Sequence, residues 1–376
     1  MELMLTSPSL TLVLGATGKT GSRVANRLLS RGLPVRTAAR SGADAHFDWD
    51  DPETYAPALR GVNRVYLLGP VMRTDFADQV LGFLDQAEAA GARHITYLSA
   101  YGVDSAPPET AMRSVELDLL GRPDLTHAIL RPAWFMQNFS ETFLKPIGGA
   151  IVVPAGDGTE AFIDAEDIAA VASATLADPE AHAGAQYALT GPEALTVAAA
   201  AKIISDVSGQ GISYTDIDRD EWVAATVAGG VPADYGAVLR TLTETIASGH
   251  GSRPNSDVEK ATGVAPVSFA DFARRTAAAW AVAETRRRRS ATCVVVLEYA
   301  SQGRAIPTGN AYGNRYISVL SIVDRKIAHW RDYLDPLAVF DAIGWPDAAA
   351  GTAARRTGLR CRYAARDLYR RTRGVP

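Results

Sequence analysis

Three glycines near the start of the chain have the spacing of a phosphate-binding turn. Gly15, Gly18 and Gly21 stand in the stretch GATGKTG, directly after an apolar and β-favouring run at residues 11–14. A pyrophosphate needs backbone N–H groups brought close with no Cβ in the way, and a following helix N-terminus supplies free donors and a positive dipole end. We expect Gly15 to make the tight turn, Gly18 to admit the phosphate and Gly21 to let helix and strand pack. An ordinary strand-to-helix turn is the alternative.

The elements around the glycines favour a dinucleotide. Apolar residues recur at helical spacing after the turn, at Val24, Leu28 and Leu29, and the stretch RGLP at 31–34 stops the helix. A second strand over 35–39 completes a βαβ unit, the context in which a glycine triplet becomes informative. The cofactor contacts predicted from the turn are Gly15, Thr17, Gly18, Lys19, Thr20 and Gly21.

The residue that ends the second strand selects the nucleotide. An acidic side chain there binds the ribose 2′-hydroxyl of NAD, whereas a guanidinium suits the 2′-phosphate of NADP. Arg40 ends this strand, Arg36 lies within it, and the first acid is Asp44. The sequence therefore favours NADP(H) over NAD, with Arg40 as a ligand. A solvated charge at a strand end is the alternative for Arg40.

Strands and helices then alternate along the chain. Strands are predicted at 45–47, 64–68, 94–99 and 128–130, where Arg131-Pro132 should break the last, and helices at 52–59, 76–90 and 112–120. This alternation predicts an α/β fold with a doubly wound parallel Rossmann sheet, whose ligands lie at the carboxyl ends of the strands. The residues expected to contact the cofactor there are Leu68, Gly69, Pro70, Ser99, Ala100 and Pro132.

Five motifs in this order identify a family resemblance. GATGKTG, FDWDDPETYAPALRGVNRVYLL, YLSAYG, ILRPAWFMQNF and FIDAEDIAAVA make residues 10–280 similar to the NmrA-like proteins, a branch of the atypical short-chain dehydrogenases. The resemblance implies an NADP(H)-binding domain over 1–284 with a small substrate subdomain from about residue 151. We expect Asp48, in the second motif, to contact the cofactor. It also implies two kinds of member, reductases of quinones, dyes and phenolic or polyketide-like molecules, and redox sensors that bind nucleotide without turnover.

The proton donor of ordinary short-chain dehydrogenases is missing from its usual spacing. Those enzymes place a Lys four residues after a Tyr, but Tyr97 and Tyr101 are followed at that distance by Tyr101 and Ser105. In NmrA-like reductases a Lys or His often begins the helix before the ILRP strand, and Arg113 holds that place. An Arg can hold a carbonyl but donates no proton of useful reactivity. Tyr101 is therefore the predicted proton donor; wall packing is the alternative.

Aromatic residues after the ILRP strand predict a flat, hydrophobic substrate site. The candidates are Trp134, Phe135 and Phe162, with Asn138 as the polar member, although half of such residues could fill the core instead. Asp164 and Asp167 stand in the first turn of a predicted helix, where acids suit the dipole, so we expect a structural role. Further helices are predicted at 197–207, 219–228, 235–248 and 269–284.

The last ninety residues have a different pattern. After an Arg-rich linker at 285–291, alternation of period two predicts strands at 293–299, 312–323 and 326–333, with a turn at 324–325. Residues 292–346 resemble part of the SnoaL-like and limonene-epoxide-hydrolase-like cone fold. Of the Asp–Arg–Asp set in such hydrolases, only Asp332 is matched, since Tyr299 and Ser301 hold the other places. We expect this partial α+β cone to dock on the reductase domain or form a homodimer, and a basic tail at 347–376 to be disordered.

Composition limits the compartment and the partners. The chain has 376 residues, 47% of them apolar, which suffices for one large core and a small appendage. No run of about 18 apolar residues occurs and the apolar start lacks a basic leader, so we expect no membrane span and no signal peptide. Cys293 and Cys361 lie far apart without metal-ligand spacing, so we expect no metal and a cytoplasmic location. Residues 355–376 hold eight Arg and one Asp, which we interpret as a solvated end, with nucleic acid as an unlikely partner.

The favoured function is an NADP(H)-dependent oxidoreductase that reduces a hydrophobic quinone, aryl ketone or polyketide-like substrate. Arg113 and the missing Tyr/Lys pair leave open a non-catalytic NADP(H) sensor that binds a protein partner. A cyclase or epoxide hydrolase in the C-terminal fragment is a third possibility, which needs more than the one matched carboxylate.

Overall fold

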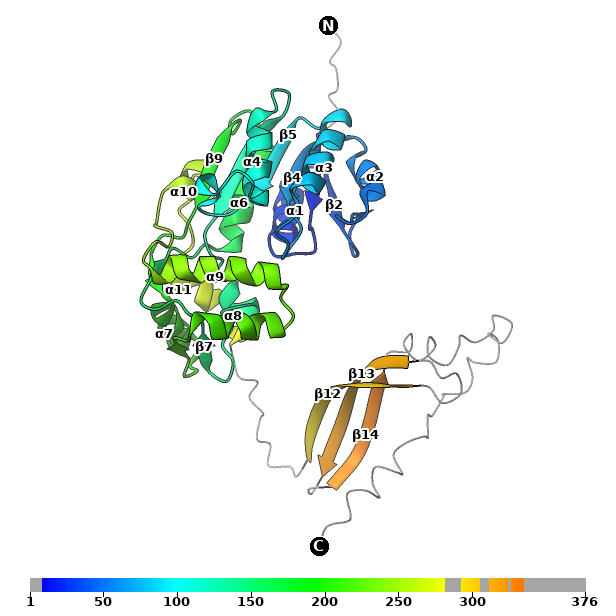
Figure 1. Ribbon diagram of the computed structural model, residues 1–376, viewed down its shortest axis with the longest axis vertical. Coiled ribbons are helices and arrows are strands. Elements are labelled where there is room, and N and C mark those ends of the chain that lie inside the picture. The colour runs from blue at the N-terminus through cyan, green and yellow to red at the C-terminus, as the bar shows by residue number, and fades with distance from the viewer. Residues whose placement is uncertain (1–8, 281–291, 305–310, 324–325, 335–376) are drawn as a thin grey trace, which may run out of the picture. The chain divides into compact units, whose positions relative to one another are not determined.

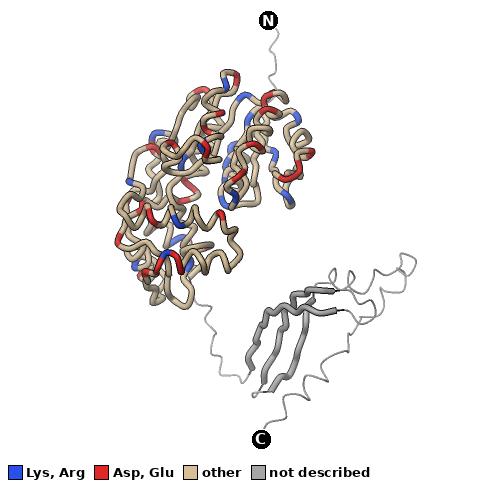
Figure 2. Tube along the Cα trace, viewed as in Figure 1, with Lys and Arg blue, Asp and Glu red and all other residues tan. Residues whose placement is uncertain are grey.

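The computed structural model describes residues 9–280 and the backbone of 292–304, 311–323 and 326–334. The chain divides into two compact units, Met1–Ala283 and Glu284–Pro376. The predicted linker, the turn at 324–325 and the basic tail lie outside the described residues. Acidic and basic residues are interspersed along the trace of the first unit (Figure 2). None of the helices in the described part of the chain has the length and apolarity that a membrane span requires.

A seven-stranded parallel sheet forms the centre of the first unit, as the alternating pattern predicted (Figure 1). Its order is β3-β2-β1-β4-β5-β6-β9, so the order reverses between β1 and β4, the switch point at which open α/β sheets bind ligands. The strands are β1 (Leu10–Leu14), β2 (Val35–Ala39), β3 (Ala45–His46), β4 (Val62–Leu68), β5 (His94–Leu98), β6 (Thr126–Pro132) and β9 (Ala185–Leu189).

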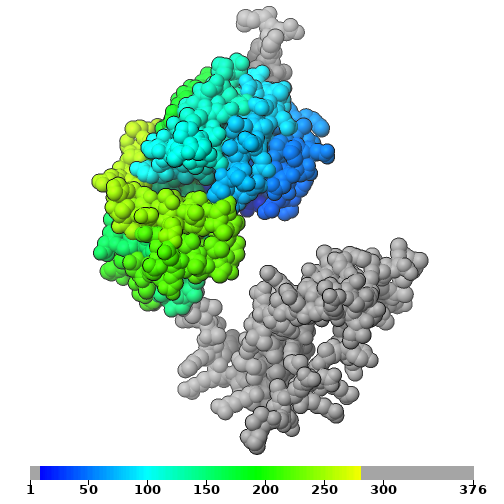
Figure 3. Space-filling view, in the orientation of Figure 1, coloured from blue at the N-terminus to red at the C-terminus, as the bar shows by residue number. Residues whose placement is uncertain are grey.

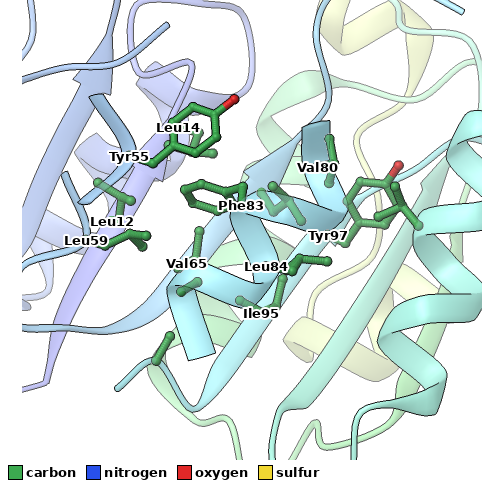
Figure 4. Close-up of a cluster of buried hydrophobic side chains, with 14 of the residues drawn as sticks. Leu12, Leu14, Tyr55, Leu59, Val65, Val80, Phe83, Leu84, Ile95 and Tyr97 are labelled. Carbon is green, nitrogen blue, oxygen red and sulfur yellow. The ribbon is translucent and has the colours of Figure 1, made fainter. Parts of the chain in front are cut away.

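Helices cover both faces of this sheet, so apolar residues on both sides of its strands are buried. One face carries α2 (Tyr55–Leu59), α3 (Ala77–Ala89) and α4 (Ala111–Gly121), and the other carries α1 (Gly21–Ser30), α6 (Ala165–Ala177) and α10 (Asp257–Thr262). Figure 4 shows the first core, where Phe83 of α3 lies between Tyr55 and the side chains of β4 and β5. Burying one such leucine or phenylalanine stabilises the fold by about 1.5–3 kcal/mol.

Strand β6 runs two residues further than predicted. Arg131 and Pro132 belong to the strand and lie opposite Ala188 and Leu189 of β9. Proline lacks only the donor, and its carbonyl still accepts the N–H of Tyr101 at 3.0 Å. The predicted break was therefore wrong: a proline at the last position of a strand ends it without shortening it.

The remaining helices of the first unit build a second core. Two small sheets, β7 (Ala150–Val152) with β11 (Ser213–Thr215) and β8 (Thr159–Glu160) with β10 (Leu195–Thr196), lie among its helices. The helices are α5 (Asn138–Glu141), α7 (Val197–Ser208), α8 (Arg219–Ala228), α9 (Ala233–Ala247) and α11 (Phe269–Thr276). The expected subdomain from residue 151 onward is interrupted, because α6, β9 and α10 pack on the main sheet.

The helix predicted over 269–284 ends earlier. It stops at Thr276 and is followed by a 3-10 turn, Ala277–Ala279. Trp280 is buried in the second core, and its indole N–H donates to the carbonyl of Phe139 at 2.7 Å. This buried hydrogen bond draws the chain inward and accounts for the early end of the helix.

In the described residues of the second unit, three strands form an antiparallel sheet in the order β12-β13-β14. The strands are β12 (Thr292–Arg304), β13 (Ala311–Val323) and β14 (Lys326–Leu334), so the predicted antiparallel pattern is present.

Candidate cofactor and substrate site

The glycine turn between β1 and α1 has the conformation that its sequence predicted. Gly15 has φ +59°, in the left-handed region, and its carbonyl accepts the N–H of Gly18 at 2.8 Å. A Cβ on Gly21 would lie 2.3 Å from the carbonyl oxygen of Gly15 and 2.9 Å from that of Leu14. Only glycine allows this close packing of helix α1 on the end of β1.

The same turn exposes the groups that a phosphate requires. Thr17 and Gly18 are exposed, and no acidic residue stands in the first turn of α1, a ten-residue helix. Free N–H groups and the positive end of the helix dipole therefore face outward without an opposing carboxylate. Thr20, at the N-cap, is buried, and Lys19 is partly buried. A dinucleotide pyrophosphate fits this cradle, into which a side chain at Gly18 would project.

The predicted strand ends meet at one edge of the sheet. A Cβ on Gly15 would lie 2.9 Å from Cδ2 of Leu68, so the ends of β1 and β4 are in contact. The N–H of Ser99 donates to Leu130 at 2.8 Å, and Tyr101 donates to Pro132. Gly69, Pro70 and Ala100 follow the ends of β4 and β5 on the same edge. A nicotinamide dinucleotide at this edge would supply hydride from its ring.

Arg40 lies beside the glycine turn with its side chain exposed. A Cβ on Gly42 would lie 3.7 Å from Cγ2 of Thr17, which shows that the loop after β2 packs on the turn. Arg36, the other arginine of this strand, donates to the carbonyls of Ala58 and Arg60 at 2.7 Å each. Its guanidinium thus caps the C-terminal end of α2, so these hydrogen bonds compete with any contact to a cofactor.

Two acids near this edge have structural contacts. Asp44 accepts hydrogen bonds from the N–H and the hydroxyl of Thr37, and these bonds hold the pKa of its carboxyl below the ordinary value. Asp48, a predicted cofactor contact, accepts the N–H of Asp50 at 3.1 Å and is partly buried. Both carboxylates therefore fix turns in the segment that follows β2.

A buried carboxylate, which the sequence analysis missed, joins the ends of β5 and β6 to helix α4. Glu116 of α4 is 0% exposed and accepts hydrogen bonds from Ser99 at 2.6 Å, Arg113 at 2.8 Å and Arg131 at 2.8 and 2.9 Å. Burial raises the pKa of Glu116, but the bonds from Arg131, Ser99 and Arg113 outweigh it and hold the pKa below the ordinary value. The i,i+3 spacing from Arg113 on one helix face was the available signal.

Of the three tyrosines on β4 and β5 or just after them, only Tyr101 reaches the surface. It is 39% exposed, whereas Tyr66 and Tyr97 are fully buried. Burial raises the pKa of both buried phenols well above the ordinary tyrosine value, which disfavours the phenolate. Tyr101 is thus the phenol of this group that can meet a bound molecule.

The aromatic candidates for the substrate side differ in exposure, although all of them pack on a core: Trp134 on the second core and Phe135 on the core beneath α6. Trp134 and Phe135 are partly exposed after β6, and Asn138 is partly buried at the start of α5. Phe162 does not face a ligand: it is 1% exposed, and its ring lies edge-on to Phe139 with centroids 4.9 Å apart. The prediction for Phe162 was wrong, because the second core needs its ring.

The loop after β4 reaches the second core at α9. The hydroxyl of Thr74 donates to Asp234 at 2.7 Å. Figure 3 shows the surface hollowed where the blue and cyan half of the first unit meets the yellow-green helices.

Asp164 caps α6, as its position predicted, and also pairs with Arg275 of α11.

Comparisons with known proteins agree with this geometry. A family model described as NAD(P)H-binding matches residues 15–179. The uncharacterized oxidoreductase YesF of Bacillus subtilis (strain 168) is 38% identical over 279 residues, 72% of this chain and 96% of that protein. Agroclavine dehydrogenase of Claviceps fusiformis is 32% identical over 278 residues, 69% of this chain and 95% of that protein.

The fold is shared with the crystal structure of Citrobacter sp. triphenylmethane reductase complexed with NADP(H). The two are 22% identical with a TM-score of 0.55, over 72% of this chain and 99% of that one. The chain therefore belongs to the NAD(P)H-binding family that includes YesF and agroclavine dehydrogenase, and it is an NAD(P)H-dependent oxidoreductase.

Proposed function

We propose that this oxidoreductase uses NADPH in preference to NADH and reduces a flat, hydrophobic quinone, aryl ketone or polyketide-like carbonyl compound. The observation that carries the proposal is that Arg40 is exposed at the end of β2, in the loop whose Gly42 approaches Thr17 of the glycine turn, since a guanidinium suits the 2′-phosphate of NADP. Partly exposed aromatic rings at Trp134 and Phe135 support a flat acceptor. Agroclavine dehydrogenase, 32% identical to this chain, is likewise named for a small-molecule substrate.

The residues of the strand edge have separate tasks in this reaction. With an aryl ketone, hydride adds to the carbonyl carbon and the oxygen takes one proton to give the alcohol; with a quinone, hydride and one proton together convert the two carbonyls to the hydroxyls of the hydroquinone. Tyr101 supplies this proton from its phenol, because Arg113 binds an oxygen by hydrogen bonds but retains its own protons at any working pH. Glu116 accepts hydrogen bonds from Arg113 and Ser99 and so fixes the positions of both side chains.

Single-turnover mixing of the NADPH-loaded protein with a panel of naphthoquinones and aryl ketones tests the proposal. We expect loss of NADPH absorbance with at least one acceptor, slower loss with NADH, and slowing of about 10²-fold or more in Tyr101→Phe. Tight NADPH binding without absorbance loss for any acceptor would contradict a reductase.

That last outcome would instead favour a sensor that binds NADP(H) and a protein partner. The specific observation behind this second candidate is the pairing of Arg113 with Glu116, which occupies part of its guanidinium.

A further inference from the structure

We propose that Lys19 is a positioning residue that links the bound dinucleotide to Asn138 through the hydroxyl of Thr142. This inference rests on the proposed function and extends it. It explains how the side-chain amide of Asn138 is oriented toward a substrate, and it makes that orientation depend on cofactor binding. Lys19 belongs to the glycine turn, whereas Asn138 and Thr142 begin and follow α5, more than a hundred residues away in sequence.

Two successive hydrogen bonds link Lys19 to Asn138, and in both the donor lies on the Lys19 side. The ammonium of Lys19 donates to Oγ1 of Thr142 at 3.1 Å, and Thr142 donates to Oδ1 of Asn138 at 2.9 Å. An ammonium has only donors, so Thr142 must accept from it and has its single hydrogen left for Asn138. With Oδ1 engaged, the amide of Asn138 keeps its N–H donors for another partner. Those donors suit the oxygen of a carbonyl or quinone acceptor.

Other contacts fix the backbone of Lys19, independently of its hydrogen bond to Thr142. Arg23 donates to the carbonyl of Lys19 at 2.6 Å and pairs with Glu166 of α6 at 2.9 Å. The side chain therefore extends from a defined point on the turn toward α5. It reaches Glu141 as well, with Nζ 3.8 Å from the carboxylate.

The ammonium has donor capacity left for the cofactor. Of its three N–H groups one is used by Thr142, and the Glu141 contact is longer than a hydrogen bond. Burial lowers the pKa of Lys19, with Arg23 adding to the shift and Glu141 opposing it, so a further anion nearby would favour the charged form. A phosphate over the exposed N–H groups of the turn provides that anion. Cofactor binding would thus hold Lys19, and through Thr142 fix Asn138.

Three variants separate the links of this chain. Thr142→Val removes the hydroxyl and keeps the shape, so NADPH affinity stays within about twofold while the affinity of the NADP⁺ complex for menadione falls about fivefold. Lys19→Met removes the donors, so NADPH binding weakens about tenfold or more and menadione binding also falls. The double variant binds menadione no worse than Lys19→Met, since both changes break one chain.

Fluorescence titrations give the affinities, and thermal unfolding tests for a merely structural role. Lys202→Met is the matched control, because Lys202 is an exposed helix lysine paired with Asp206, and it should leave both affinities unchanged. Additive effects of the two changes, or unaltered menadione affinity in Thr142→Val, would overturn the proposal.

A readout without menadione separates this inference from the proposed substrate class. The side-chain amide signal of Asn138, assigned by its loss in Asn138→Asp, should shift on adding NADP⁺ in the wild type and stay in place in Thr142→Val. If the wild type binds NADP⁺ but no quinone, the substrate class fails while this signal still decides the link. An equal shift in both proteins refutes the link.

Discussion

Replacing Gly21 by alanine should damage the first unit from inside the cofactor turn. The new Cβ would lie 2.3 Å from the carbonyl oxygen of Gly15 and 2.9 Å from that of Leu14. Carbon–oxygen contacts rarely close below about 3.3 Å, so α1 or the turn must shift by roughly 1 Å. Both oxygens belong to the backbone, and no side chain can move aside.

The cost follows from the packing of this joint. Overpacking a well-packed site costs about 1–3 kcal/mol, and we expect the upper end because the colliding groups are backbone on both sides. For a unit of this size, about 3 kcal/mol lowers Tm by roughly 6–12 °C. NADPH affinity should fall with it, since the shifted turn no longer presents its N–H groups together.

Two other glycines serve as controls for the same substitution. Gly82, in α3, has nothing within 4 Å of its added Cβ, so Gly82→Ala should raise stability by about 0.5–1 kcal/mol. Gly18→Ala meets only the Gly15 oxygen, at 3.2 Å, so it should lower Tm far less than Gly21→Ala does and weaken NADPH binding by about tenfold or more. Helical circular dichroism reports Tm, because every helix in the described residues lies in the first unit. A Gly21→Ala protein with wild-type Tm and NADPH affinity would refute the reasoning.

Three further predictions concern single side chains. Arg40→Ser should weaken NADPH binding by about tenfold or more and leave NADH binding unchanged, as measured by fluorescence titration. Equal losses of affinity for both nucleotides would show that Arg40 does not bind the 2′-phosphate. Glu116→Gln should cost about 3–5 kcal/mol in denaturant unfolding, because Arg113 and Arg131 lose their buried counter-charge; a loss below 1 kcal/mol would contradict that role. His94 has its pKa lowered to about 3 by burial and by nearby Arg64, so only the unfolded chain takes up this proton as the pH falls below 6.5. His94 should therefore lower stability by about 2 kcal/mol between pH 7 and pH 5, so His94→Gln should lose less stability than the wild type by that amount, whereas His250→Gln, a control at an exposed histidine, should keep the full loss.

The fold of the first unit was predictable where local pattern and topology agree. The β1–α1–β2 unit follows from one apolar run, one glycine turn and one helical face, and its strand β2 has the predicted bounds. The meeting of Gly15 with Leu68 also follows, since neighbouring parallel strands end at the same edge.

The features that sequence reasoning missed depend on distant partners. Phe162 looked available for a ligand, but Phe139 and Phe269 surround its ring, and neither neighbour can be inferred from adjacent residues. Glu116 looked like an ordinary helix acid until the ends of β5 and β6 brought Ser99 and Arg131 to it. Helix α11 ends early because Trp280 bonds Phe139, another contact between remote segments.

The interrupted course of the chain around β9 has a consequence for engineering. The polypeptide leaves the main sheet after β6, returns through α6 and β9, departs again, and comes back at α10. The two segments between β6 and α6 and between β9 and α10 are thus anchored at both ends on the main sheet, whereas α11 and Trp280 return to the second core after α10. A chimera that exchanges these two segments together with α11 and Trp280 between relatives, with junctions inside β6, α6, β9 and α10, should transfer acceptor preference while the glycine turn and the main sheet stay intact.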